Sequence, residues 1–146
     1  MDRRSFLETS GLLTVAVASV PLGTLLAGCS TIPERNAEIM GDMAVVPKDV
    51  FMVDGKRSPV VVLRVPGKKT PIALVSERED EVKCFLMLCT HKKCEVTAQQ
   101  GQFVCHCHGS EFDQSGAVMK GPAKESLLEI PVSTDGLVYG IPLAKW

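Results

Sequence analysis

The stretch "CHCHGSEF", residues 105–112, places two cysteines and two histidines in four consecutive positions. The chain has only three histidines, and the third lies in "CTHKKC", residues 89–94. Each stretch directly follows a run that is typical of a strand, "EVKCFLML" (81–88) or "GQFV" (101–104). Both stretches are therefore predicted to be loops that project from strand ends. Loops from neighbouring strands can meet at one end of a sheet, so we expect these two to share a metal site.

Both loops contain cysteine and histidine at spacings suited to metal ligands. The first offers a Cys-x-His pair and the second a Cys-x-x-His pair, with 13 residues between the pairs. One cysteine and one histidine from each loop make a four-ligand set, which consists of Cys89, His91, Cys105 and His108. Cys94, Cys107 and His106 lie outside this set. Two cysteines and two histidines also make a structural zinc site, so the spacing alone leaves zinc open.

The chain after residue 43 is predicted to be an all-β domain, residues 44–146. Its short apolar runs are separated by turns rich in Gly, Pro and charged residues. The further runs are "SPVVVLRV" (58–65), "TPIALVS" (70–76) and "LLEIPVSTDGLVYGIPL" (127–143), in which Asp135-Gly136 predicts a β-hairpin. No stretch shows helical periodicity with caps. This pattern favours a small antiparallel barrel or sandwich.

Length and charge limit what the domain can do. The chain has 146 residues and a formal net charge of −1, which argues against a nucleic-acid-binding protein. About 100 residues remain after the N-terminal segment, and a domain of this size is stabilised by disulfides or metal sites. It is too short to hold a second, catalytic domain. Cys84 alternates with Leu86 and Leu88 on one strand face and is predicted to be a small buried hydrophobe.

The N-terminal segment carries targeting signals and is excluded from the fold. Adjacent Arg3 and Arg4, in "MDRRSFLETSGLL", resemble a twin-arginine export signal. "LLAGCS" (25–30) resembles a lipobox, which predicts cleavage after residues 1–28 and lipidation of Cys29. The uncharged stretch of residues 9–33 exceeds the ~20 apolar residues that span a bilayer, so an uncleaved membrane anchor remains an alternative. Residues 29–43 are predicted to be a linker.

Taken together, "CTH" with Cys94, "C-x-CHGS" and the downstream "FDQSGAVMKGPAKESL" resemble the paired signature of Rieske iron–sulfur proteins of the bc type. The resemblance extends over roughly residues 45–142. It implies the Rieske fold, in which a cluster-binding subdomain formed by two loops sits on an antiparallel β base. The cysteine pair outside the ligand set and Gly109-Ser110 match this family, whereas a zinc site does not require them.

The resemblance implies one [2Fe-2S] cluster and a role for each cysteine and histidine of the two loops. Cys89 and Cys105 bind one iron, and His91 and His108 bind the other. Neutral imidazoles make such a centre easier to reduce, so Rieske centres lie at ~−150 to +300 mV, against ~−400 mV for plant-type ferredoxins. The remaining pair, Cys94 with Cys107, forms a disulfide that joins the loops.

The resemblance also implies how the surroundings adjust the reduction potential. Ser110 matches a serine that bonds a bridging sulfide, and Gly121-Pro122 belongs to a loop that covers the cluster. Phe112 takes the place of a tyrosine that bonds a ligand sulfur, and it has no hydroxyl to donate. We therefore expect a potential some tens of millivolts below otherwise similar bc-type centres. The alternative is that Phe112 simply packs in the core.

The sequence departs from the bc-type family at the tip of the cluster-binding region. Lys92 and Lys93 replace the usual Leu-Gly, and His106 replaces a proline. Two more lysines, Lys120 and Lys124, flank the Gly-Pro loop. Ammonium groups lose hydration on entering an apolar quinol pocket, whereas they attract an acidic protein surface. The alternative is that these lysines are ordinary solvated residues.

We therefore expect a one-electron transfer protein that has no catalytic residues of its own. It is anchored to the outer, periplasmic face of a bacterial membrane by a lipid or by its N-terminal segment. Its expected partner is a c-type cytochrome or a periplasmic oxidoreductase. The alternative is the Rieske subunit of a quinol:cytochrome c oxidoreductase with a cytochrome b partner. A Rieske oxygenase does not fit, because all three histidines already lie in the two loops.

Overall fold

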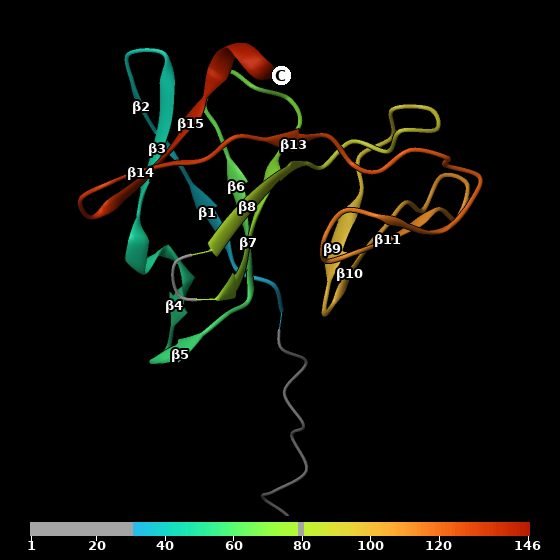
Figure 1. The fold of residues 1–146 in the computed structure, drawn as a ribbon, viewed down its shortest axis with the longest axis horizontal. Helices are drawn as coiled ribbons and strands as arrows, with labels where there is room; N and C mark the ends of the chain where they lie inside the picture. Colours follow the sequence, from blue (N-terminus) through green and yellow to red (C-terminus); the bar gives the residue numbers. More distant parts are fainter. Residues whose placement is uncertain (1–30, 79–80) are drawn as a thin grey trace, which may run out of the picture.

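The computed structural model describes residues 31–78 and 81–146, which form an all-β structure with two short 3-10 helices. Figure 1 shows a larger base beside a smaller subdomain that carries strands β9 to β11. The 3-10 helices are η1 (Lys48–Phe51) and η2 (Leu143–Lys145), both in the base. The predicted fold class is confirmed.

The central sheet of the base has five strands in the order β1-β6-β7-β8-β13. Its strands are β1 (Glu34–Asn36), β6 (Val60–Arg64), β7 (Ile72–Arg78), β8 (Glu81–Leu86) and β13 (Glu129–Ile130). All pairings are antiparallel except that of β1 with β6. Both faces of β6 and β7 are apolar, which is why these strands read as continuous hydrophobic runs.

The second sheet covers one face of the central sheet and completes the sandwich. Its order is β14-β15-β3-β2, with bounds Ser133–Asp135, Val138–Pro142, Met43–Pro47 and Glu38–Met40. Phe51, Leu63 and Leu74 are fully buried in the core that includes residues of both sheets. A two-stranded hairpin, β4 (Met52–Val53) and β5 (Lys56–Arg57), lies beside it.

The third sheet forms the smaller subdomain, in the order β12-β11-β10-β9. Its bounds are Val118–Lys120, Glu111–Asp113, Gln102–Val104 and Thr97–Gln99. A second core contains Val60, Ala73 and Phe85 from the central sheet together with Phe103 and Phe112 from this sheet. Alternate residues of the central strands thus belong to two different cores. The second core packs the smaller subdomain against the base.

The paired region begins before the predicted boundary at residue 44. Residues 34–40, in the predicted linker, form β1 and β2, which pair with β6 and β3. Every residue of β1 and β2 is exposed and only Ala37 between them is buried, so no apolar alternation marks these strands in the sequence. The predicted hairpin near residue 136 forms between β14 and β15, with Gly136 at φ 52°. Its two loop residues are Gly136 and Leu137, one position later than Asp135-Gly136.

Candidate metal centre

The first loop follows β8 and is closed by its own backbone hydrogen bonds. The N–H of Lys93 donates to the carbonyl oxygen of Cys89 at 2.9 Å, and the N–H of Cys89 donates to that of Cys94 at 2.7 Å. The chain can close in this way because Lys93 adopts a left-handed conformation, with φ 57°. Few residues other than glycine take this conformation readily, because the Cβ atom crowds the backbone.

The second loop joins β10 to β11 and repeats the same pattern. The N–H of Gly109 donates to the carbonyl oxygen of Cys105 at 2.9 Å, and the N–H of Cys105 donates to that of Ser110 at 2.8 Å. Gly109 has φ 77° and occupies the position that Lys93 holds in the first loop. Two loops of equal geometry therefore present one cysteine each, Cys89 and Cys105, at the same point of the turn.

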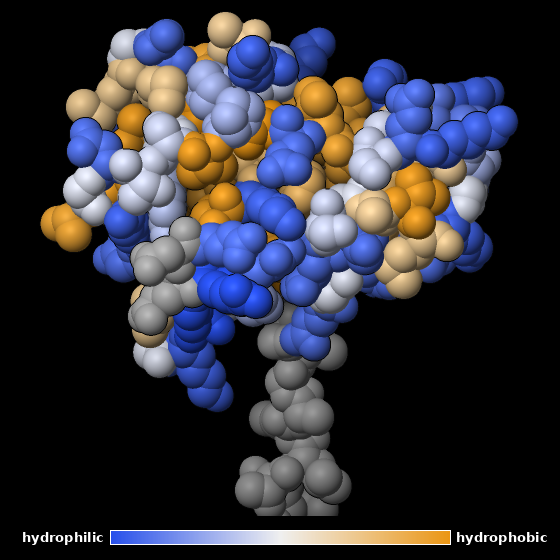
Figure 2. Space-filling view, in the orientation of Figure 1, coloured by the Kyte–Doolittle hydropathy of each residue, from blue (hydrophilic) through white to orange (hydrophobic). Residues whose placement is uncertain are grey.

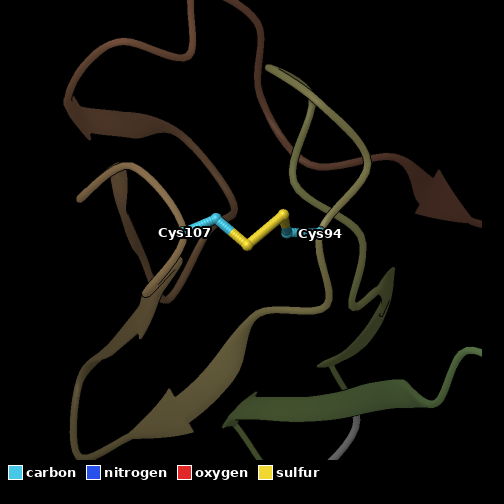
Figure 3. The surroundings of a disulfide bond; sticks show 2 residues. All are labelled: Cys94 and Cys107. Carbon is cyan, nitrogen blue, oxygen red and sulfur yellow. A yellow bond between two sulfur atoms is a disulfide. The ribbon is translucent and has the colours of Figure 1, made fainter.

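A disulfide between Cys94 and Cys107 joins the two loops (Figure 3), as predicted. Their Cα atoms are 6.5 Å apart. The sulfur of Cys105 and the two disulfide sulfurs all lie within 4.8 Å of one another. Because disulfide sulfurs are not thiolates, these three cysteines do not form a three-thiolate metal site. Within residues 31–78 and 81–146, the free thiols are those of Cys84, Cys89 and Cys105.

The two thiols of the predicted ligand set lie side by side and are buried. Cys89 and Cys105 are each 1 % exposed. Burial raises the pKa of the Cys89 thiol, but hydrogen bonds from the backbone of His91 and Lys92 and from the side chains of Cys105 and Ser110 lower it below its ordinary value. These donors stabilise a thiolate, which is the form that binds metal.

Cys84 has a different environment, in the core of the base. It is fully buried, and burial strongly raises the pKa of its thiol. This agrees with its predicted role as a small buried hydrophobe.

The two histidines of the predicted set lie beside each other. The ring centroids of His91 and His108 are 4.9 Å apart, with the ring planes at 89°. Nδ1 of His91 is buried and has no hydrogen-bond partner. A buried polar nitrogen without a partner is costly, and neutral imidazole nitrogen is a common metal ligand. Two buried thiols and two adjacent imidazoles, one with an unpartnered nitrogen, fit the donor set of a two-thiolate, two-imidazole cluster.

The residues expected to adjust the potential are buried beneath the loops. Ser110 is fully buried, and its hydroxyl oxygen accepts a hydrogen bond from the N–H of Ala123 at 3.0 Å. Phe112 is also fully buried and belongs to the core shared with the base, which confirms that it packs there. Its effect on the potential stays a prediction. Gly121 and Pro122 are exposed in the segment just before Ala123.

One contact at the loops was not predicted from the sequence. The hydroxyl of Thr90 donates to the carbonyl oxygen of Glu125 at 2.6 Å, so the Gly-Pro segment is bonded to the first loop as well as to Ser110. Threonine at position 90 gives no sequence signal for this bond, because its partner is a backbone atom 35 residues away. The segment that follows Gly121-Pro122 is thus hydrogen-bonded to both loops.

The basic residues of this end differ in their surroundings. Lys92, Lys93 and His106 are exposed, as expected for a solvated tip. Lys120 instead pairs with Glu111, with 2.9 Å between Nζ and the carboxylate oxygen. Lys120 thus differs from Lys92, Lys93 and Lys124, which make no ion pair within residues 31–78 and 81–146.

Comparison with known proteins decides what the site holds. A model of the Rieske [2Fe-2S] domain family matches residues 38–133, which is more than half of the chain. The chain belongs to the Rieske [2Fe-2S] family. This assignment decides between zinc and iron in favour of a [2Fe-2S] cluster as the cofactor of the domain.

The chain is also similar to individual proteins and solved structures. The chain is 30% identical over 134 residues to the chloroplastic cytochrome b6-f complex iron-sulfur subunit of Pisum sativum, covering 82% of this chain and 57% of that protein. It thus spans little more than half the length of that relative. The plasma membrane Rieske protein PetC3 of Synechocystis PCC 6803 is 30% identical, with a TM-score of 0.48 over 57% of this chain and 85% of that chain. The quaternary ammonium Rieske monooxygenase CntA shares the fold, with a TM-score of 0.53 at 13% identity over 71% of this chain and 32% of that chain.

The predicted targeting features lie outside the described residues. These are the twin arginines Arg3 and Arg4 and the lipobox cysteine Cys29. Among residues 31–78 and 81–146, no helix is long and apolar enough to cross a membrane.

Proposed function

We propose that this protein is a one-electron carrier whose cluster is held by Cys89, His91, Cys105 and His108. The observations that support the ligand set best are the unpartnered, buried Nδ1 of His91 beside the ring of His108 and the burial of the two thiols. When bound, a cluster with two thiolate and two imidazole ligands supplies a one-electron couple at higher potential than an all-thiolate cluster.

The chain's own residues separate the two ends of such a site. The thiols of Cys89 and Cys105 are buried, and the backbone of His91 and Lys92 together with the side chains of Cys105 and Ser110 lower the pKa of the Cys89 thiol. The histidines lie toward solvent, and His108 is exposed. We infer that electrons enter and leave at the histidine side, because that side is open to a partner protein. No residue is assigned a bond-making role.

The proposed site of action is the outer face of a bacterial membrane. The support is the twin-arginine and lipobox pattern, with lipidated Cys29 as the anchor and an uncleaved N-terminal segment as the alternative. The proposed partner is a c-type cytochrome or a periplasmic oxidoreductase. Mass spectrometry of the native N-terminus tests the anchor, since a mature protein that begins at lipidated Cys29 supports it and an intact Arg3-Arg4 segment contradicts it.

A second candidate function is the Rieske subunit of a quinol:cytochrome c oxidoreductase with a cytochrome b partner. The relatives named as cytochrome b6-f complex iron-sulfur subunits favour it. The exposed Lys92 and Lys93 oppose it, because two ammonium groups lose hydration on entering an apolar pocket.

Rapid mixing distinguishes the two functions. We expect the oxidised protein to be reduced by a reduced soluble c-type cytochrome, or the reverse, in a one-electron step, and to react slowly with a quinol both alone and in the presence of a cytochrome b complex. Fast, pH-dependent reduction of the wild-type protein by the quinol would favour the oxidoreductase subunit. The double variant Lys92→Leu/Lys93→Gly would then be reduced no faster than wild type.

A further inference from the structure

Three exposed lysines lie around the histidine side of the site. Lys93 directly precedes Cys94, which is bonded to Cys107, and Cys107 lies between the exposed His106 and His108. Lys93 and its neighbour Lys92 are therefore close to the exposed histidines of the second loop. Figure 2 shows hydrophilic residues at the upper right of the molecule, above an apolar patch, on the side where Figure 1 places the smaller subdomain.

The third lysine, Lys124, is held at the same end by hydrogen bonds of the residues on either side of it. The N–H of Ala123 donates to Ser110 in the second loop at 3.0 Å. The carbonyl oxygen of Glu125 accepts from Thr90 in the first loop at 2.6 Å. The backbone of Lys124 is thus bonded to both loops through its neighbours, and its side chain is exposed.

The charge of these lysines is not balanced by ion pairs. Within the described ranges, the ion pairs are Arg64–Glu34, Arg64–Glu95, Lys83–Glu77 and Lys120–Glu111. None of them involves Lys92, Lys93 or Lys124. Two acidic residues near the loops, Glu95 and Glu111, are therefore already engaged by other cations. Exposed Glu125 adjoins Lys124 in the sequence and is one carboxylate against three lysines that make no ion pair in the described ranges.

We propose that Lys92, Lys93 and Lys124, here called the lysine rim, form the docking surface for a redox protein that carries carboxylates around its own redox centre. This proposal rests on the proposed function as an electron carrier. Long, solvated ammonium side chains attract an acidic surface over about one Debye length, ~10 Å at 0.1 M salt, and so orient the encounter. The exposed His108 beside the rim is then brought close to the partner.

Two small oxidants of opposite charge test the rim without knowledge of the natural partner. The cluster-loaded, reduced protein is mixed with ferricyanide, an anion, and with tris(1,10-phenanthroline)cobalt(III), a cation, at rising ionic strength. We expect the rate constant for ferricyanide to fall with salt and that for the cobalt complex to rise. The net charge of −1 alone predicts the reverse, so the sign of the salt dependence reports the local charge.

Charge-reversal variants locate the effect. We expect Lys92→Glu and Lys93→Glu each to slow ferricyanide oxidation roughly tenfold at ~10 mM ionic strength and to accelerate oxidation by the cobalt complex. Lys56 is an exposed lysine of the β4–β5 hairpin, in the base and away from the two loops. Lys56→Glu makes the same change of net charge and serves as the matched control. Rates are expressed per cluster, from the visible spectrum, so that loss of cluster is not read as slower transfer.

A binding measurement separates docking from electron transfer. Hexacyanocobaltate(III) has the charge of ferricyanide and is redox-inert, and its cobalt-59 NMR line is expected to broaden with the wild-type and Lys56→Glu proteins but not with Lys92→Glu/Lys93→Glu. Equal rates and equal line widths for the rim variants and the control would overturn the rim while leaving the electron carrier intact. If neither oxidant removes an electron from the reduced protein, the proposed function itself fails.

Discussion

Replacing Lys93 by glycine is expected to stabilise the protein, although it removes a side chain. Lys93 has φ 57°, a left-handed conformation that costs an L-residue roughly 1–2 kcal/mol. Glycine removes that cost but adds about 0.4–1 kcal/mol of unfolded-chain entropy. The difference is a net gain centred at about 0.8 kcal/mol, in a range of about 0–1.6 kcal/mol. For a domain of this size, that corresponds to a rise in melting temperature of roughly 3–6 °C.

The assay is thermal unfolding of the cluster-loaded protein at one fixed scan rate, followed by far-UV circular dichroism and by the visible absorbance of the cluster. Lys92→Gly is the matched control, because it removes the same charge at a residue whose φ is not positive, and it is expected to lower the midpoint. Gly109→Ala tests the equivalent position of the second loop. No atom lies within 4 Å of the added Cβ there, so its cost comes from φ 77° alone. If Lys93→Gly and Lys92→Gly lower the midpoint equally, the left-handed conformation is not a cost and the reasoning is refuted.

Three further substitutions test the packing and the site. Serine at both Cys94 and Cys107 is expected to destabilise the loops by about 3 kcal/mol, since the disulfide closes a short loop; unfolding midpoints that match wild type would contradict this. Phe112→Tyr is expected to raise the reduction potential in voltammetry, by at most roughly 65–130 mV for one hydrogen bond to a charged group, and an unchanged potential would show that the ring does not reach a sulfur. Gly116→Ala is expected to unfold more easily than Gly101→Ala in denaturant. Both glycines have φ near 80°, but a Cβ on Gly116 would meet a buried phenyl ring at 2.8 Å, whereas nothing lies within 4 Å at Gly101; equal losses would contradict the packing.

The strands of the base and the pairing of Cys94 with Cys107 could be predicted from the sequence. The apolar runs of β6 and β7 are strong signals because both faces of these strands are buried along most of their length. The two loops contain so few cysteines and histidines that the family's spacing fits them in one way only. The disulfide in the structure agrees with that spacing.

Other features could not be predicted, for identifiable physical reasons. Residues 34–40 form strands through backbone pairing alone, with almost no buried side chain to mark them. The pairing of Lys120 with Glu111 depends on the register between β11 and β12, which a sequence does not reveal. The left-handed conformation of Lys93 follows from loop closure, and the lysine itself argues against it.

The central claim is that Cys89, His91, Cys105 and His108 hold the cluster, and neighbouring residues of the second loop offer its sharpest test. His106 and His108 flank the same half-cystine and both are exposed, so alanine at either position removes the same side chain from the same loop. The direct measurement is the EPR spectrum of the dithionite-reduced protein, with iron counted per chain. The account predicts that His106→Ala keeps the wild-type spectrum and two irons per chain, while His108→Ala loses both. A Rieske spectrum that survives in His108→Ala and disappears in His106→Ala would contradict it.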